Sequence, residues 1–138
     1  MAIGKFVRTA NLAFLCSLLA ACAANGPAHP AGWTKNGTDA WKNGAQTYAV
    51  RSEPYDNDIK EFASQEAIGV VLREKHARFV SSYQYDGCPG LAALLTFQVA
   101  AKPPRTLLEG VTVWKGRATV VAYERPASAP EDPAVEKA

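Results

Sequence analysis

In the central part of this 138-residue chain, hydrophobic positions recur with two different periods. Over residues 46–52, Tyr48 and Val50 alternate with polar or small neighbours, which is typical of a strand with one buried face. Over residues 59–76, apolar positions recur at intervals of three and four, which is typical of an amphipathic helix. The pattern therefore predicts a strand followed by a helix.

The predicted helix has a recognisable start signal. Asp58 is a suitable N-cap residue, and Glu61 stands three positions later, as in a capping box. Gly69 weakens the helix prediction slightly, because glycine costs about 1 kcal/mol relative to alanine in a helix interior. We expect the helix to begin directly after Asp58.

Short apolar or alternating runs predict four further strands after the helix. The last two are β-branched runs joined by Lys115 and Gly116, a spacing that is typical of a β-hairpin. The first two are separated by Asp-Gly-Cys-Pro-Gly, which is a strong turn signal. The four predicted strands are residues 78–85, 92–101, 106–114 and 117–124.

The predicted element order is β-α-β-β-β-β within one domain, residues 46–125. One amphipathic helix can cover one face of a mostly antiparallel sheet, so we expect an α+β fold, a small two-layer sandwich. Residues 22–45 are expected to form a flexible tether with Trp-Lys-Asn-Gly turns. Residues 126–138, rich in Pro, Ala and charged residues, are expected to form a disordered tail.

The first 22 residues have the pattern of an export signal. Lys5 and Arg8 form a positive start, and residues 12–19 form an apolar run that is too short for a transmembrane helix. The segment ends in Leu19-Ala20-Ala21-Cys22, which resembles the lipobox of bacterial lipoproteins.

This resemblance implies an anchor and a compartment. It implies a signal peptide of residues 1–21 and attachment of lipid to Cys22, and two or more acyl chains hold a protein stably on a membrane. Because Ala23 rather than aspartate follows the cysteine, it implies the outer membrane, with the domain facing the periplasm. The alternative is a plain signal peptide cut after Ala21, which would release a soluble periplasmic protein.

Charge and cysteine content narrow the possible functions. The chain has 15 basic and 13 acidic residues, and loss of Lys5 and Arg8 with the leader would balance the two signs. A neutral chain gives no electrostatic argument for a nucleic-acid partner. Lipidation of Cys22 would leave Cys88 as the single thiol beyond the leader, so an intramolecular disulfide is not expected, whereas an intermolecular one is an alternative.

Cys88 and His76 form the main enzymatic alternative. A cysteine nucleophile needs a base that generates the thiolate near neutral pH. The outline resembles a family of cell-wall cysteine peptidases that are often lipoproteins, and it implies a cell-wall cysteine hydrolase. In that family the histidine follows the cysteine, but no histidine follows Cys88 here, so we do not expect catalysis.

Two tryptophans are the candidate binding residues. Trp33 and Trp41 stand eight positions apart, each shortly followed by lysine, asparagine and glycine. Exposed tryptophan rings could stack on sugar rings of a glycan; alternatively, both rings pack into the core beside Asn-Gly turns. The remaining thiol and the two histidines are too few for a zinc site, and no phosphate-binding loop is present, so we expect no metal and no cofactor.

Together, these features favour a non-enzymatic accessory or binding role. The predicted domain is small and carries no recognisable catalytic constellation, and lipid on Cys22 would hold it at a membrane. The expected partner, besides the membrane, is an envelope protein or peptidoglycan.

Overall fold

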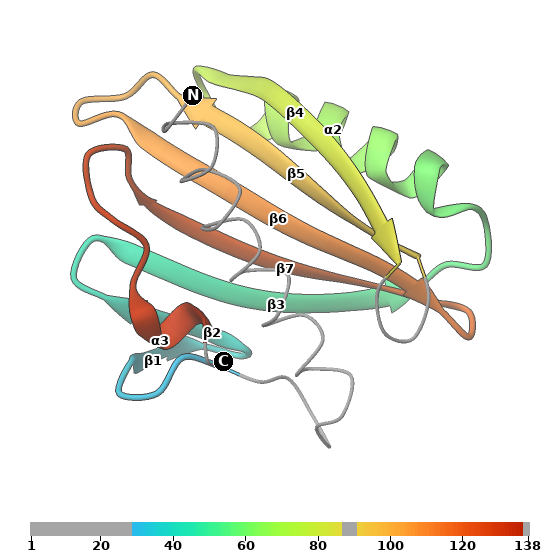
Figure 1. Cartoon of the computed structure of the whole chain (residues 1–138), viewed down its shortest axis with the longest axis horizontal. Helices are drawn as coiled ribbons and strands as arrows, with labels where there is room; N and C mark the ends of the chain where they lie inside the picture. Colours follow the sequence, from blue (N-terminus) through green and yellow to red (C-terminus); the bar gives the residue numbers. More distant parts are fainter. Residues whose placement is uncertain (1–28, 87–90, 137–138) are drawn as a thin grey trace.

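An antiparallel sheet of seven strands forms the body of the molecule, and one long helix lies on it (Figure 1). The structure is a computed structural model that describes residues 29–86 and 91–136. The strands lie side by side in the order β1-β2-β3-β7-β6-β5-β4. The elements are β1 Thr34–Gly37, β2 Ala40–Asn43, β3 Gln46–Pro54, α2 Ile59–Arg73, β4 Ala77–Asp86, β5 Leu91–Val99, β6 Arg105–Trp114, β7 Arg117–Pro126 and α3 Pro133–Glu136.

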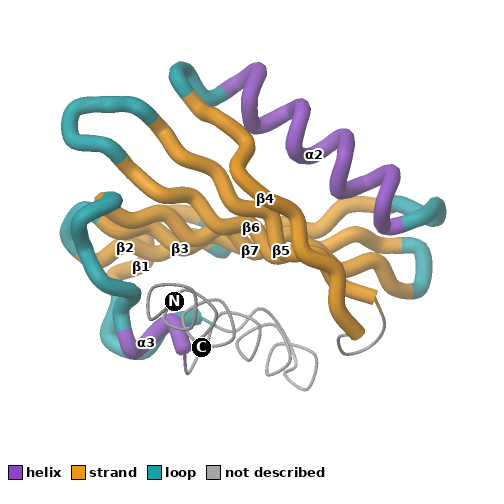
Figure 2. The backbone as a smooth tube through the Cα atoms, turned by 45° about the horizontal axis from the view of Figure 1, so that its top comes forward, coloured by secondary structure: helices purple, strands orange, loops and turns teal. Residues whose placement is uncertain are grey.

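Helix α2 covers one face of the sheet and connects β3 to β4, which lies at the far edge (Figure 2). Its apolar stripe, which includes Phe62 and Val70, packs on apolar residues of that face such as Phe97, Val111 and Val120. Burial of each large apolar side chain contributes roughly 1.5–3 kcal/mol, so this layer holds the helix in place. Among the described residues, neither α2 nor another helix is long and apolar enough to cross a membrane.

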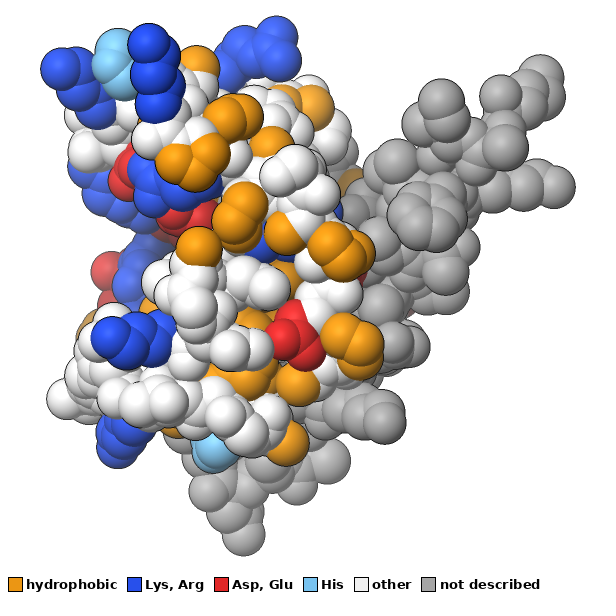
Figure 3. Space-filling view, turned by 90° about the vertical axis from the view of Figure 1, so that its left-hand side faces the viewer, with side chains coloured by type: hydrophobic (Ala, Val, Ile, Leu, Met, Phe, Trp, Pro, Cys, Tyr) orange, Lys and Arg blue, Asp and Glu red, His pale blue; other side chains and the backbone are white. Residues whose placement is uncertain are grey.

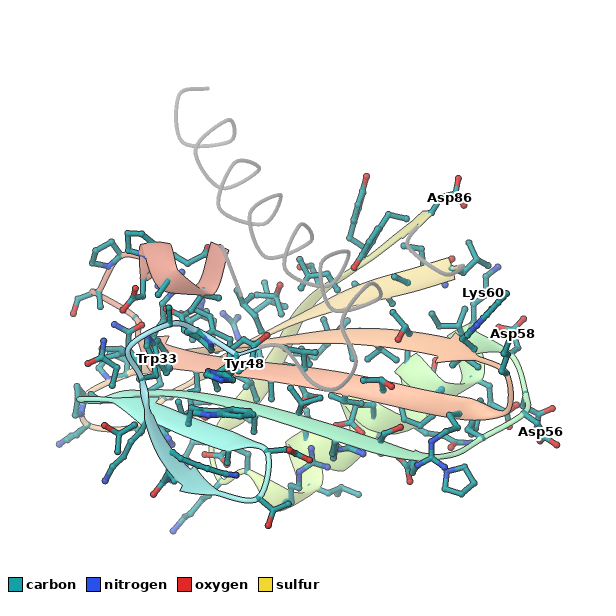
Figure 4. All side chains as sticks on the ribbon, turned by 90° about the horizontal axis from the view of Figure 1, so that it is seen from below. Trp33, Tyr48, Asp56, Asp58, Lys60 and Asp86 are labelled. Carbon is teal, nitrogen blue, oxygen red and sulfur yellow. The ribbon has the colours of Figure 1, made fainter. Side chains whose placement is uncertain are left out.

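The opposite face carries an aromatic cluster near the β1 edge of the sheet. Trp33, Trp41, Tyr48 and Tyr123 are buried there, and Val135 of α3 belongs to the same cluster. Figure 4 shows Trp33 and Tyr48 close together at this side of the molecule. The segments on either side of the predicted domain are therefore parts of its second core.

The predicted fold class is confirmed, because the structure is α+β with one main helix packed on an antiparallel sheet. Asp58 caps α2, since its side chain accepts a hydrogen bond from the Lys60 N–H at 2.6 Å. The β6–β7 hairpin turns at Lys115 and Gly116, whose φ angles of 49° and 75° suit the tight turn expected there.

The predicted element order lacked two strands. Residues 34–37 and 40–43 lie in the predicted tether, but they form β1 and β2, so the order starts with three strands before the helix. Trp41 pairs with Tyr48 across β2 and β3, and burial of these large rings outweighs the turn-rich composition of the segment.

Two predicted boundaries also differ from the structure. Helix α2 ends at Arg73 rather than at residue 76, because Glu74 is extended and His76, with φ of 67°, turns the chain toward β4. Within the predicted disordered tail, residues 133–136 form α3, and Val135 is buried in the aromatic cluster. Burial of that one apolar side chain ties the segment to the sheet, which its polar composition did not indicate.

Candidate functional site

The structure places the described residues that the sequence singled out in two separate regions, with Trp33 and Trp41 in one and His76 in the other. His76 lies at the start of β4, whereas Trp33 and Trp41 lie near β1, at the opposite edge of the sheet. Cys22 and Cys88 lie outside the described residues, so lipidation of Cys22 and the roles considered for Cys88 stay predictions.

Both tryptophans are packed against other rings. Trp33 and Trp41 are 8% and 7% exposed. The ring of Trp33 lies 6.4 Å from that of Tyr48 and 6.2 Å from that of Tyr123, and Trp41 stacks on His29 at 4.6 Å. This is the packing alternative; stacking on a sugar stays a prediction that requires the rings to leave this cluster.

His76 is exposed beside an open pocket at the start of β4. Arg78, Val80 and Gln98 line this pocket together with His76. Across the described ranges, no group of three or more His, Cys, Asp or Glu side chains is placed to hold a metal ion. The pocket therefore offers a ligand the positive charge of Arg78 and the apolar side chains of residues such as Val80.

The two edges of the sheet differ strongly. Strand β1 has four residues, includes Lys35, and pairs irregularly with β2, and all three features commonly protect a sheet edge from further pairing. Strand β4 pairs with β5 along residues 77–86, with one register shift at Val80. From residue 79 to residue 85 it contains no charged residue and no proline. Its outer side, which no described strand covers, is therefore a long edge without central charge or proline, and the register shift at Val80 is its one irregularity.

Exposed apolar side chains lie on both faces of β4. Phe79 and Tyr83 are 42% and 59% exposed. Phe79 faces the α2 side, because it pairs with Phe97, which packs against α2, and their rings lie 5.8 Å apart. Tyr83 pairs with Leu94, which belongs to the aromatic cluster of the opposite face.

Helix α2 adds a further apolar residue to this edge. Arg73 contacts Glu66 and Glu109, so its flank of the helix faces β6. At 3.6 residues per turn, Val71 projects from nearly the opposite flank, on the side of β4, and it is 42% exposed. We call the exposed set Val71, Phe79, Val80 and Tyr83 the β4 strip.

Positive charge gathers at the start of β4. Lys75 and Arg78 lie there on either side of His76, and Lys102 lies in the neighbouring β5–β6 loop. None of these four side chains forms an ion pair with another residue of the described ranges. Figure 3 shows Lys, Arg and His side chains together at this corner of the surface. The corner is therefore an exposed cationic site.

The other end of β4 is acidic. Figure 4 shows Asp86, the last residue of the strand, at the same end of the molecule as Asp56 and Asp58 of the β3–α2 loop. Lys60 lies among them and offsets part of this charge. The electrostatic potential therefore changes sign along β4, from positive at its start to negative at its end.

Two glutamates are buried between α2 and the sheet, and half-exposed arginines lie beside them. Glu66 of α2 and Glu109 of β6 are 7% and 2% exposed. Arg73 Nη2 lies 2.8 Å from Glu66 Oε1 and 3.9 Å from Glu109 Oε2, and Arg51 of β3 forms a second ion pair with Glu66. Gly69 makes room for Arg73, since a Cβ at Gly69 would lie 3.1 Å from Arg73 Nη1.

The pKa values of the two buried glutamates are shifted in opposite directions. Burial raises the pKa of Glu109 to about 8, and the adjacent Glu66 carboxylate acts in the same direction. Burial would also raise the pKa of Glu66, but hydrogen bonds from Arg51, Glu109 and Arg73 lower that pKa to about 2. Because Glu66 belongs to α2 and Glu109 to β6, the pair and its arginines join the helix to the sheet.

The comparisons with known proteins bear on the fold. No family model matches the chain, and no curated protein matches it. Among solved structures, it is similar to the crystal structure of a protein of unknown function from Pseudomonas aeruginosa, with a TM-score of 0.55 and 8% identity, over 72% of this chain and 76% of that chain. At this low identity, the likeness shows a shared fold alone.

The sequence analysis identified neither the β4 strip nor the Glu66–Glu109 pair. A signal for the pair was present, since Glu66 falls on the apolar stripe of the helix and Glu109 interrupts an apolar strand, and unpaired glutamates are rarely buried. The position of β4 at an edge depends on pairing between distant segments, which no local pattern carries.

Proposed function

We propose that this chain is a membrane-anchored envelope lipoprotein with a non-enzymatic binding role, and that its β4 edge receives a segment of an envelope protein. The observation that supports the binding role is the long edge of β4, which has no charge or proline from residue 79 to residue 85 and carries exposed apolar side chains. Extended peptides add to such edges through main-chain hydrogen bonds, while neighbouring side chains select the sequence. Most proteins shield their sheet edges more fully than this, so an edge of this length that is interrupted only at Val80 favours a partner.

The anchor is supported by the sequence alone. Leu19-Ala20-Ala21-Cys22 favours lipid attachment to Cys22 and a periplasm-facing position on the outer membrane. Anchoring would suit a binding protein, since confinement to one surface raises the effective concentration of its partners.

A protein partner is favoured over peptidoglycan. Trp33 and Trp41, the residues suited to stacking on sugars, have their rings packed against neighbours, whereas the β4 edge offers backbone groups to a polypeptide. The cell-wall hydrolase alternative depends on Cys88, which lies outside the described residues.

Metabolic labelling with a palmitate analogue tests the anchor. The natural chain and a Cys16→Ala variant should both be labelled, because Cys16 lies within the predicted leader, whereas Cys22→Ala should lose the label. Labelling of the Cys22→Ala variant would show that the lipobox was misidentified.

Site-specific photo-crosslinking in intact cells tests the binding role. A photoreactive residue at position 83 should capture one defined envelope protein, whereas the same residue at position 42, on the exposed side of β2, should not. Equal capture from both positions would refute the role of β4. If position 83 captures no protein and the Cys88→Ser variant fails to complement a strain that lacks this chain, the hydrolase alternative is favoured instead.

A further inference from the structure

The direction of β4 and its charges together define which segment fits its edge. Each neighbouring pair of strands in the sheet is antiparallel, and antiparallel pairing is slightly more stable per residue than parallel pairing. A segment added antiparallel to β4 would place its C-terminal end beside Lys75, His76 and Arg78. Its N-terminal end would lie beside Asp86.

Resting on the proposed function, we infer that β4 binds an extended protein segment that runs antiparallel to it, is acidic at its C-terminal end and has alternating apolar residues before that end. Lys75 and Arg78 have no carboxylate partner among the described residues, and Arg78 lines, with His76, an open pocket that an acidic side chain can enter. The opposite charge at Asp86 disfavours the same segment in the reverse direction.

The β4 strip accounts for the apolar positions of the segment. Successive side chains of a strand point to opposite faces of the sheet. Those on the α2 side would lie against Val71 and Phe79, and those on the other side against Tyr83. Both faces of the incoming segment therefore meet apolar surface, which favours apolar residues at alternate positions, accepts threonine between them and disfavours charge in the centre.

A second copy of the chain is the competing occupant, and the register shift at Val80 disfavours it. In a symmetric pair of β4 strands, Val80 of one copy would not lie opposite Val80 of the other unless the ladder were centred on the irregularity itself. In every other symmetric register, the irregularities of the two copies would interrupt the ladder at two different points, which shortens the continuous pairing.

Two synthetic peptides of equal composition test the inference on the full-length lipidated chain in detergent micelles. One is acetyl-Arg-Thr-Val-Thr-Val-Thr-Val-Thr-Asp-Glu-amide, and the other has this order reversed; both carry a fluorophore on a central threonine replaced by lysine. Exposed charge pairs contribute about 0.2–1 kcal/mol each, or up to about fivefold in affinity, so the first peptide should bind about tenfold more tightly at low salt. Fluorescence anisotropy measures both affinities.

Matched variants separate the charge from the edge. Arg78→Gln should remove most of the preference between the peptides, whereas Lys42→Gln, on β2, should leave it unchanged. Val71→Lys should weaken both peptides, whereas Ile68→Lys, on the outer surface of α2, should weaken neither. High salt should reduce the preference, because exposed charges are screened.

The outcomes distinguish the inference from the proposed function. If both peptides bind equally and Val71→Lys abolishes this binding, the edge binds a segment but its charges do not select the direction. If neither peptide binds but position 83 still captures an envelope protein in cells, the inferred segment with an acidic C-terminal end is wrong, while the proposed binding role stands. Failure in both assays would overturn both proposals, and a dimer abolished by Val71→Lys would assign the edge to a second copy.

Discussion

Replacing Glu109 by glutamine isolates the effect of the buried carboxyl pair on stability. The pKa of Glu109 is raised from 4.5 to about 8 in the folded chain, so between these values the folded state holds a proton that the unfolded state has lost. This group therefore contributes stability that is fully present below pH 4.5 and is lost as the pH rises through 8. At about 1.4 kcal/mol per tenfold change in proton binding, the loss between pH 5 and pH 8 reaches at most ~4 kcal/mol.

Glutamine keeps the shape of the protonated acid and can donate to the Glu66 carboxylate, but it does not titrate. We expect Glu109→Gln to flatten the decline in stability between pH 5 and 8 and to stabilise the protein at pH 8 by about 2 kcal/mol, allowing for relaxation of the buried site. Urea unfolding at several pH values measures this change. Glu53→Gln is the matched control, since Glu53 is half-exposed and pairs only with Arg51 among the described residues. Parallel pH curves for the natural chain and Glu109→Gln would refute the reasoning.

Three further substitutions test the packing of α2. Asp58→Ala should destabilise the chain by about 1 kcal/mol, because it removes the acceptor for the Lys60 N–H, whereas Asp56→Ala should have little effect; equal losses in thermal unfolding would contradict the cap. Gly69→Ala should stabilise the helix by less than the usual ~1 kcal/mol, because the new Cβ presses on Arg73, and a full gain in urea unfolding would contradict this contact. Glu66→Gln should destabilise the chain at pH 7 by roughly 3 kcal/mol, because it removes the carboxylate that neutralises two arginines, and a neutral result in the same assay would show that the ion pairs contribute nothing net.

Local signals were enough to predict much of the fold. The cap at Asp58 and the turn at Lys115 and Gly116 depend on neighbouring residues only, so the sequence carries them directly. Asn43-Gly44 is a signal of the same kind, and β2 and β3 do form a hairpin around Gly44, which has φ of 60°. The prediction assigned that stretch to a tether because the whole segment is rich in turn-forming residues.

The candidate site could not be predicted in the same way. The partnership of Glu66 with Glu109 and Arg51 joins a helix to two strands that are distant in sequence. The exposure of β4 likewise follows from the pairing of β3 with β7, which leaves β4 at the far edge. These features arise from tertiary packing, and the alternation of residues along β4 is the same whether the strand is central or at an edge.

The strand order has a mechanical consequence for a chain held at Cys22. Strands β1 and β4 are six interstrand spacings apart, which at ~4.8 Å each is ~29 Å, so the edge proposed to bind lies across the full width of the sheet from the edge where the N-terminal segment joins it. A pull on the membrane end would act first on the packing of His29 and Trp33, and then on the short β1–β2 ladder, whose hydrogen bonds would open one after another. Load from the anchor would therefore be released by peeling the first hairpin, while the β4 edge and any segment paired with it stayed unstrained.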